Sequence, residues 1–82
     1  MTVKETIIEL MREVAEATDA ELVADLNDET ILLQSGLDSL GFAILVARLE
    51  EQLGYDPFTL MEEPFYPHNL EEFVSIYVRF AP

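Results

Sequence analysis

The chain lacks cysteine and is poor in basic residues, with four lysines and arginines against 17 acidic residues. Without cysteine, no disulfide can hold the fold, and no thiolate can bind a metal or act as a nucleophile. The formal net charge of −13 argues against binding to nucleic acid, because phosphate groups would be repelled. The same charge disfavours an anionic membrane surface and steers the protein toward basic partner surfaces.

Long apolar runs are also missing. No run approaches the roughly 20 residues that a membrane-spanning helix needs. The first residues, Met1 to Glu5, lack the basic and then apolar order of a secretory signal. We therefore expect a cytoplasmic protein without a membrane partner. With 82 residues, half of them hydrophobic, we expect one domain spanning residues 1–82, with a single small core, that acts as a monomer.

Apolar residues recur with helical period in three segments. The expected helices run from about Val3 to Ala17, from Ser39 or Leu40 to Leu53, and from about Leu70 to Phe80. Thr2 and Glu5 fit a capping box before the first helix. Gly54 should end the second helix, and Asn69 with Glu72 should cap the last.

The segments between these helices are less regular. Thr18 to Leu37 should form a long loop, with a helical turn or two in 20–26 and a chain turn at 27–30. Ile31, Leu32 and Leu33 are expected to return to the core. A short helix is expected from Thr59 to Glu63, with Leu60 and Met61 directed inward. No repeat and no strand pattern is present, so the sequence predicts a small all-α four-helix bundle.

Gly36-Leu37-Asp38-Ser39-Leu40 precedes the second helix and carries the candidate site. Ser39 should expose its hydroxyl at the helix N-terminus, where the free amides and the helix dipole favour an anionic group. No base nearby in the sequence would activate Ser39, so it suits a modified serine better than a nucleophile. Asp38 can cap the helix, Gly36 permits a positive φ, Leu37 can anchor the loop, and Leu40 should stay partly exposed. The alternative role for Ser39 is an ordinary N-cap.

This segment, with the chain's length, acidity and helix order, resembles the acyl and peptidyl carrier proteins over nearly the whole chain. The resemblance implies a non-catalytic, stand-alone carrier whose Ser39 bears 4′-phosphopantetheine, attached from coenzyme A by a phosphopantetheinyl transferase. Asp38 would help the transferase to recognise the site. The arm would hold an acyl, aminoacyl or peptidyl group as a thioester. An activating ligase would load it, and a synthase, transferase or thioesterase would receive it.

The second helix is expected to present a partner face. That face comprises Leu40, Ala43, Ile44, Ala47, Glu50 and Glu51. Fatty-acid carriers usually bear an acid about five residues after the serine, where this chain has Ile44. This departure favours a specialised pathway of the polyketide or nonribosomal-peptide type over fatty-acid synthesis. Phe42 and the aromatic residues Tyr55, Phe58, Phe65 and Tyr66 suggest a tightly filled bundle with a short or polar load.

Other functions have weaker support. The alternative from another class is an unmodified acidic helical module that binds proteins as an adaptor or inhibitor. Asp25, Asn27 and Glu29 alternate like the start of a calcium loop, but the glycine and the final glutamate of such a loop are missing. His68, the only histidine, is expected to serve a loop or a cap, and not catalysis with Ser39.

Overall fold

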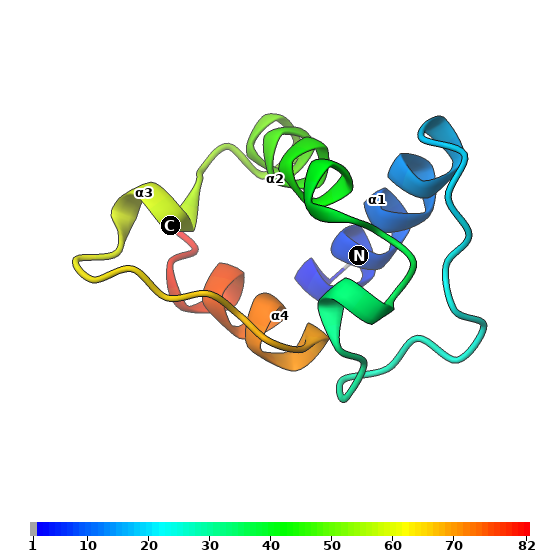
Figure 1. Ribbon diagram of the computed structural model, residues 1–82. Coiled ribbons are helices and arrows are strands. Elements are labelled where there is room, and N and C mark those ends of the chain that lie inside the picture. Colours follow the sequence, from blue (N-terminus) through cyan, green and yellow to red (C-terminus); the bar gives the residue numbers. More distant parts are fainter. Residues whose placement is uncertain (1) are drawn as a thin grey trace.

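The computed structural model describes residues 2–82 as a helical bundle with a long first loop (Figure 1). The elements are α1 (Val3–Ala17), the 3₁₀ turn η1 (Leu32–Gln34), α2 (Ser39–Leu53), α3 (Pro57–Leu60) and α4 (Leu70–Arg79). α1 packs against both α2 and α4. Residues 2–82 contain no strand, only an isolated bridge between Ile31 and Asn69. The predicted all-α fold, with a long first loop and a short third helix, is confirmed.

The helix boundaries follow from local capping. Thr2 and Glu5 form the predicted capping box, in which the Thr2 hydroxyl accepts from the Glu5 amide at 3.1 Å. Asn69 caps α4 by accepting from the Glu72 amide at 2.9 Å. Gly54 ends α2 in the left-handed conformation, with φ of 87°. Each prediction for these ends is confirmed.

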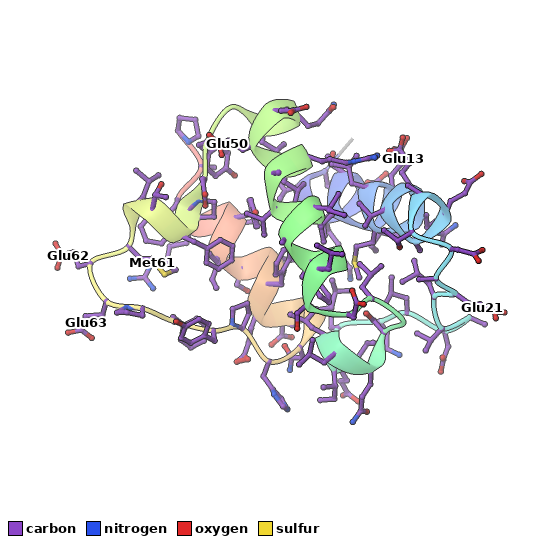
Figure 2. All side chains as sticks on the ribbon, turned by 45° about the horizontal axis from the view of Figure 1, so that its top comes forward. Glu13, Glu21, Glu50, Met61, Glu62 and Glu63 are labelled. Carbon is purple, nitrogen blue, oxygen red and sulfur yellow. The ribbon has the colours of Figure 1, made fainter. Side chains whose placement is uncertain are left out.

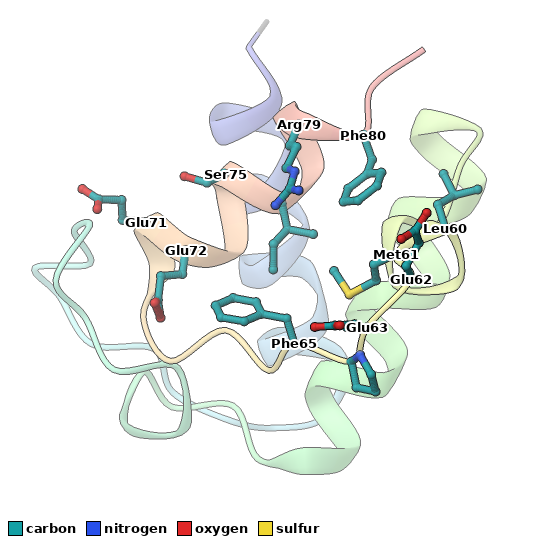
Figure 3. A pocket seen from close by; sticks show the side chains of 12 residues that line it. Leu60, Met61, Glu62, Glu63, Phe65, Glu71, Glu72, Ser75, Arg79 and Phe80 are labelled. Carbon is teal, nitrogen blue, oxygen red and sulfur yellow. The ribbon is translucent and has the colours of Figure 1, made fainter.

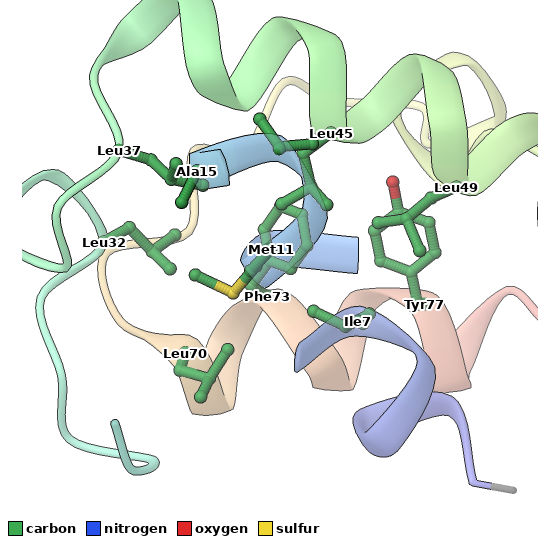
Figure 4. Close-up of a cluster of buried hydrophobic side chains, with 11 residues drawn as sticks. Ile7, Met11, Ala15, Leu32, Leu37, Leu45, Leu49, Leu70, Phe73 and Tyr77 are labelled. Carbon is green, nitrogen blue, oxygen red and sulfur yellow. The ribbon is translucent and has the colours of Figure 1, made fainter. Parts of the chain in front are cut away.

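The core lies between α1, α2 and α4 (Figure 4). Its completely buried apolar side chains come from all three helices and comprise Ile7, Met11, Val14, Leu45, Leu49, Leu70 and Tyr77. Leu32 and Leu37 join them from the long loop, so this loop is part of the core packing. An aromatic cluster extends the core toward α3, where the rings of Phe58, Phe73 and Tyr77 lie with centroids 5.2 to 6.1 Å apart.

The long loop departs from the prediction in two places. Residues 20–26 do not form a helix, because the chain is tied to the next part of the loop: Val23 donates from its amide to the Ser35 carbonyl at 2.9 Å. Leu22 and Leu26 still pack against the core as expected. Leu33 is 69% exposed, so its predicted place in the core is wrong. The tight turn of η1 directs Leu32 inward and its neighbour outward.

The third helix lies earlier than predicted. It begins at Pro57, since proline suits the first helical position, and the Asp56 carboxylate accepts from the Phe58 amide at 2.9 Å. It therefore ends at Leu60, which is 55% exposed and not inward. Met61 is half-buried.

The segment after α3 also corrects the expected aromatic filling of the bundle. Pro64 and Pro67 keep this segment out of helical structure. Phe65 is 47% exposed and Tyr66 is 86% exposed, so neither fills the core. The inner aromatic cluster contains Phe73 and Tyr77 of α4, whose helical spacing predicts burial, and they pack with the predicted inner aromatics Phe42, Tyr55 and Phe58.

No helix within residues 2–82 combines the length and the apolar content that crossing a membrane requires.

Candidate functional site

The loop that leads into α2 is held in place by Gly36 and Leu37. Gly36 has φ of 119°, and a Cβ built there would lie 2.2 Å from the Glu21 carbonyl oxygen. Only glycine allows this approach, since any side chain would meet the backbone of the loop's first half. Leu37 is 2% exposed and belongs to the core cluster. The two residues thus fix where α2 begins, as the sequence predicts.

Asp38 is the N-cap of α2. Its Oδ1 accepts a hydrogen bond from the Gly41 amide at 2.8 Å. Gly41 is buried, and a Cβ there would come within 3.3 Å of the Leu37 side chain. A glycine in the first turn of a helix is the local signal for this close packing, which the sequence-based reasoning did not use.

Ser39 is therefore the first residue of α2 and not its cap, so the N-cap alternative for Ser39 is wrong. Its side chain is exposed. The Ser39 hydroxyl forms no hydrogen bond with any group in residues 2–82. The hydroxyl is free to react with an outside reagent.

The surroundings of Ser39 fit a phosphodiester. α2 has 15 residues, so its dipole places partial positive charge at this end. Asp38 satisfies the Gly41 amide, and the Asp38 carbonyl accepts from Phe42 at 3.0 Å. Within the described chain, the amides of Ser39 and Leu40 have no acceptor, so they remain available to phosphate oxygens.

The predicted partner face is largely exposed. Leu40 is 67% exposed, and the small and acidic residues Ala43, Ala47, Glu50 and Glu51 are exposed as well. Helical spacing puts these five residues on the same side of α2 as Ser39. Ile44 lies at the margin of this face, because it is half-buried and packs against the core.

The acidic side chains are distributed over most of the surface. In Figure 2, Glu13, Glu21 and Glu50 extend to solvent from three separate segments. Among residues 2–82, no group of three or more side chains is arranged to hold a metal ion. The region of Asp25, Asn27 and Glu29 instead forms a turn, in which Asn27 Oδ1 accepts from the Glu29 amide at 2.9 Å.

His68 serves the loop through its backbone. Its carbonyl accepts from the Leu32 amide at 3.0 Å, and its own amide donates to Glu72 Oε1 at 2.9 Å. These bonds join the first loop to the start of α4.

The environment of the Tyr77 hydroxyl is a feature that the sequence pattern could not reveal. The side chain is completely buried, and its oxygen has no hydrogen-bond partner within residues 2–82. Burial raises the pKa of this phenol, and the negative charge of Asp56 adds to the shift. Tyr55 is the neighbouring phenol, and it donates to the Tyr77 carbonyl at 2.5 Å.

The structure is a small helical domain with an exposed serine at the start of α2. The comparison with family models agrees, since the model of the phosphopantetheine attachment site matches residues 5–59. The match covers more than half of the chain and includes Gly36 to Leu40. The chain belongs to the phosphopantetheine attachment site family. Neither the curated proteins nor the solved structures yielded a match.

Membership of this family brings the cofactor and the general role. Domains of the family bind a covalently attached 4′-phosphopantetheine and are carriers without catalytic activity of their own. They work with a phosphopantetheinyl transferase and with partner enzymes. The free Ser39 hydroxyl and the two unpaired amides of this chain fit such a group.

Proposed function

We propose that Ser39 is the attachment residue and that residues 1–82 act as one carrier domain for acyl, aminoacyl or peptidyl groups. When attached, the arm supplies a terminal thiol that holds the carried group as a thioester. The observation that carries the proposal is the exposed, unbonded Ser39 hydroxyl beside free helix amides, within the region that the family model matches.

Each residue around Ser39 has a separate task in this proposal. Asp38 satisfies the Gly41 amide and presents a carboxylate beside the hydroxyl for recognition by the transferase. Gly36 and Leu37 hold the loop so that the serine faces solvent. Leu40, 67% exposed next to the serine, offers an apolar contact to the transferase and to later partners.

The partner enzymes would dock on the exposed face of α2. Between Ser39 and Glu50 this face offers Ala43 and Ala47, so a partner can approach the helix closely over two turns. Glu50 and Glu51 would attract basic residues at the far end. The absence of an acid at position 44 supports a specialised pathway of the polyketide or nonribosomal-peptide type, with an activating ligase and a synthase, transferase or thioesterase as partners.

The packing of the bundle supports a short or polar load. Phe42, Phe58 and Phe73 fill the space between α2, α3 and α4, with ring centroids 6.1 Å apart in both contacting pairs. A long acyl chain would have to displace these rings. We therefore expect a long-chain acyl group on the carrier to be hydrolysed as fast as a short one. Protection of the long chain would contradict the proposed load.

The attachment itself is tested by intact-protein mass spectrometry. The wild type and the Ser39→Ala variant are incubated with coenzyme A, magnesium and a broadly specific phosphopantetheinyl transferase. One phosphopantetheine adduct on the wild type and none on the variant is the expected result. An unmodified wild type with several transferases would favour the alternative, an acidic helical interaction module.

A further inference from the structure

A second surface feature lies outside the matched region and away from α2. A cleft of about 770 Å³ opens between α4 and the segment that follows α3 (Figure 3). Its apolar lining includes Met61, Phe65, Ile76 and Phe80. No lining residue belongs to α2 or to the loop before it, and all lie within 60–80, beyond the matched residues 5–59. We call this feature the α4 cleft.

One wall of the α4 cleft faces α4 and is formed by the segment that follows α3. This segment makes hydrogen bonds only at its two ends. At one end the Met61 amide donates to the Pro57 carbonyl at 3.1 Å, and at the other end His68 bonds to Leu32 and Glu72. Within the described chain, residues 62–67 take part in no hydrogen bond. This wall can therefore shift, and its amides can serve a bound chain, without loss of internal bonds.

Part of the apolar lining of the cleft is exposed to solvent. Residues 2–82 hold seven exposed large hydrophobic residues, and Leu60, Phe65 and Tyr66 are three of them. Leu60 and Phe65 line the cleft. Exposed aromatic and aliphatic side chains at a hollow are typical of surfaces that bury an anchor residue of a partner.

Carboxylates stand at both ends of this lining. Glu62 and Glu63 lie at one end and Glu71 and Glu72 at the other, with Phe65 between them (Figure 3). The one ion pair within residues 2–82 joins Lys4 to Asp28, so these four carboxylates have no paired cation there. Arg79 is the cation in the lining, and its guanidinium lies 5.4 Å from the Phe80 ring centroid. The lining therefore carries an excess of negative charge.

We propose that the α4 cleft docks a basic segment of a partner protein, with an aromatic or large aliphatic anchor seated between Phe65 and Phe80. Lysines or arginines on either side of the anchor pair with the carboxylates at the two ends. An anionic lipid or an acidic peptide would meet repulsion from the same groups. Since this contact leaves α2 free, a partner can hold the carrier here while the face beside Ser39 meets an active site.

The test is direct binding of a short synthetic peptide in which one tryptophan is flanked by lysines and arginines. The protein contains no tryptophan, so tryptophan emission reports the peptide alone. We expect saturable binding with a blue shift as the indole leaves water. The apo protein and Ser39→Ala should bind equally, so the result does not depend on the proposed attachment. A peptide with glutamates in place of the basic residues should not bind.

Matched variants locate the contact. Phe65→Ala should weaken binding at least about fivefold, while Tyr66→Ala, an exposed neighbour outside the lining, should leave it unchanged. Glu62→Lys with Glu63→Lys should weaken binding far more than Glu9→Lys with Glu13→Lys, the same charge change on exposed residues of α1. Circular dichroism verifies the fold of each variant. Equal losses within either pair, or an unshifted emission, would overturn the proposal.

Discussion

Gly36 lies directly against the backbone of Glu21, so that a Cβ on the glycine would come within 2.2 Å of the Glu21 carbonyl oxygen. The contact joins the first half of the long loop to the segment that enters α2. Leu37, the residue after Gly36, is buried in the core and also holds this segment in place. The position of Ser39 thus depends on a contact made by residues 15 positions apart in the chain.

Gly36→Ala should be strongly destabilising for this reason. Both the positive φ and the backbone clash oppose a side chain, and we expect a loss of at least about 2 kcal/mol in the free energy of unfolding. Gly54→Ala is the matched control, because Gly54 also has positive φ but nothing lies within 4 Å of a Cβ there. It should cost only about 1 kcal/mol, the penalty of the left-handed conformation alone. Urea unfolding of both variants measures the difference, and equal losses would show that the Glu21 contact is unimportant.

The two roles assigned to Asp38 can be separated by substitution. Asp38→Ala removes the cap on the Gly41 amide and should lower the free energy of unfolding by about 1 kcal/mol. Asp38→Asn retains a capping oxygen and should keep most of the stability. If the charge of Asp38 guides the transferase, both variants should be modified more slowly than the wild type. Normal modification of Asp38→Asn would limit Asp38 to capping.

Much of the fold can be predicted because its signals are local. Thr2, Asp38 and Asn69 each bond to an amide three residues ahead, and such pairs are visible in the sequence. Gly54 likewise ends α2 through its own conformation. The candidate site lies at one of these local signals, so the sequence could place Asp38 and Ser39 at the start of α2.

The errors lie in the segments between the long helices, where apolar residues alone do not show which side chains are buried. Leu33 and Leu60 are apolar, yet the short turns that contain them direct them to solvent. Residues 20–26 form no helix, and Val23 within them donates its amide to the Ser35 carbonyl. The Tyr77 hydroxyl is buried without a partner because of how α4 packs against α2 and α3, and the sequence does not show this packing.

Tyr77→Phe should stabilise the protein by about 1 kcal/mol, because it removes a buried hydroxyl without a partner. Tyr55→Phe, which loses the bond to the Tyr77 carbonyl, should instead destabilise it by a similar amount. Thermal unfolding at neutral pH checks both signs. A loss of stability in Tyr77→Phe would mean that the hydroxyl has a partner in solution.

The same tyrosine predicts a pH dependence. Its pKa is raised by burial, whereas in the unfolded chain it titrates near 10.0. The folded state then binds the proton more tightly, so stability is complete below pH 10.0 and falls as pH rises above it. Tyr77→Phe should make this alkaline loss shallower in urea unfolding measured across that range. An unchanged slope would contradict the raised pKa.

Leu37 and Leu40 are three positions apart and have opposite environments. Leu37→Ala empties a site in the core and should cost about 2 to 4 kcal/mol in urea unfolding. Leu40→Ala, at a side chain that is 67% exposed, should change stability by less than about 0.5 kcal/mol. Leu40→Ala should nevertheless slow modification of Ser39, if the transferase contacts this side chain. Wild-type modification rates would exclude Leu40 from that interface.

Glu50 and Glu51 are exposed at the far end of the α2 face, where a basic partner surface would meet them. Glu50→Lys with Glu51→Lys should slow loading by the partner ligase at low salt, since attraction becomes repulsion during the encounter. Added salt should reduce the difference in loading rate between the wild type and this variant, because screening weakens both the attraction and the repulsion. Glu9→Lys with Glu13→Lys on α1 gives the same change in net charge and should leave loading nearly unaffected. If the two double variants load at equal rates, net charge alone governs the encounter, and the α2 face has no special electrostatic role.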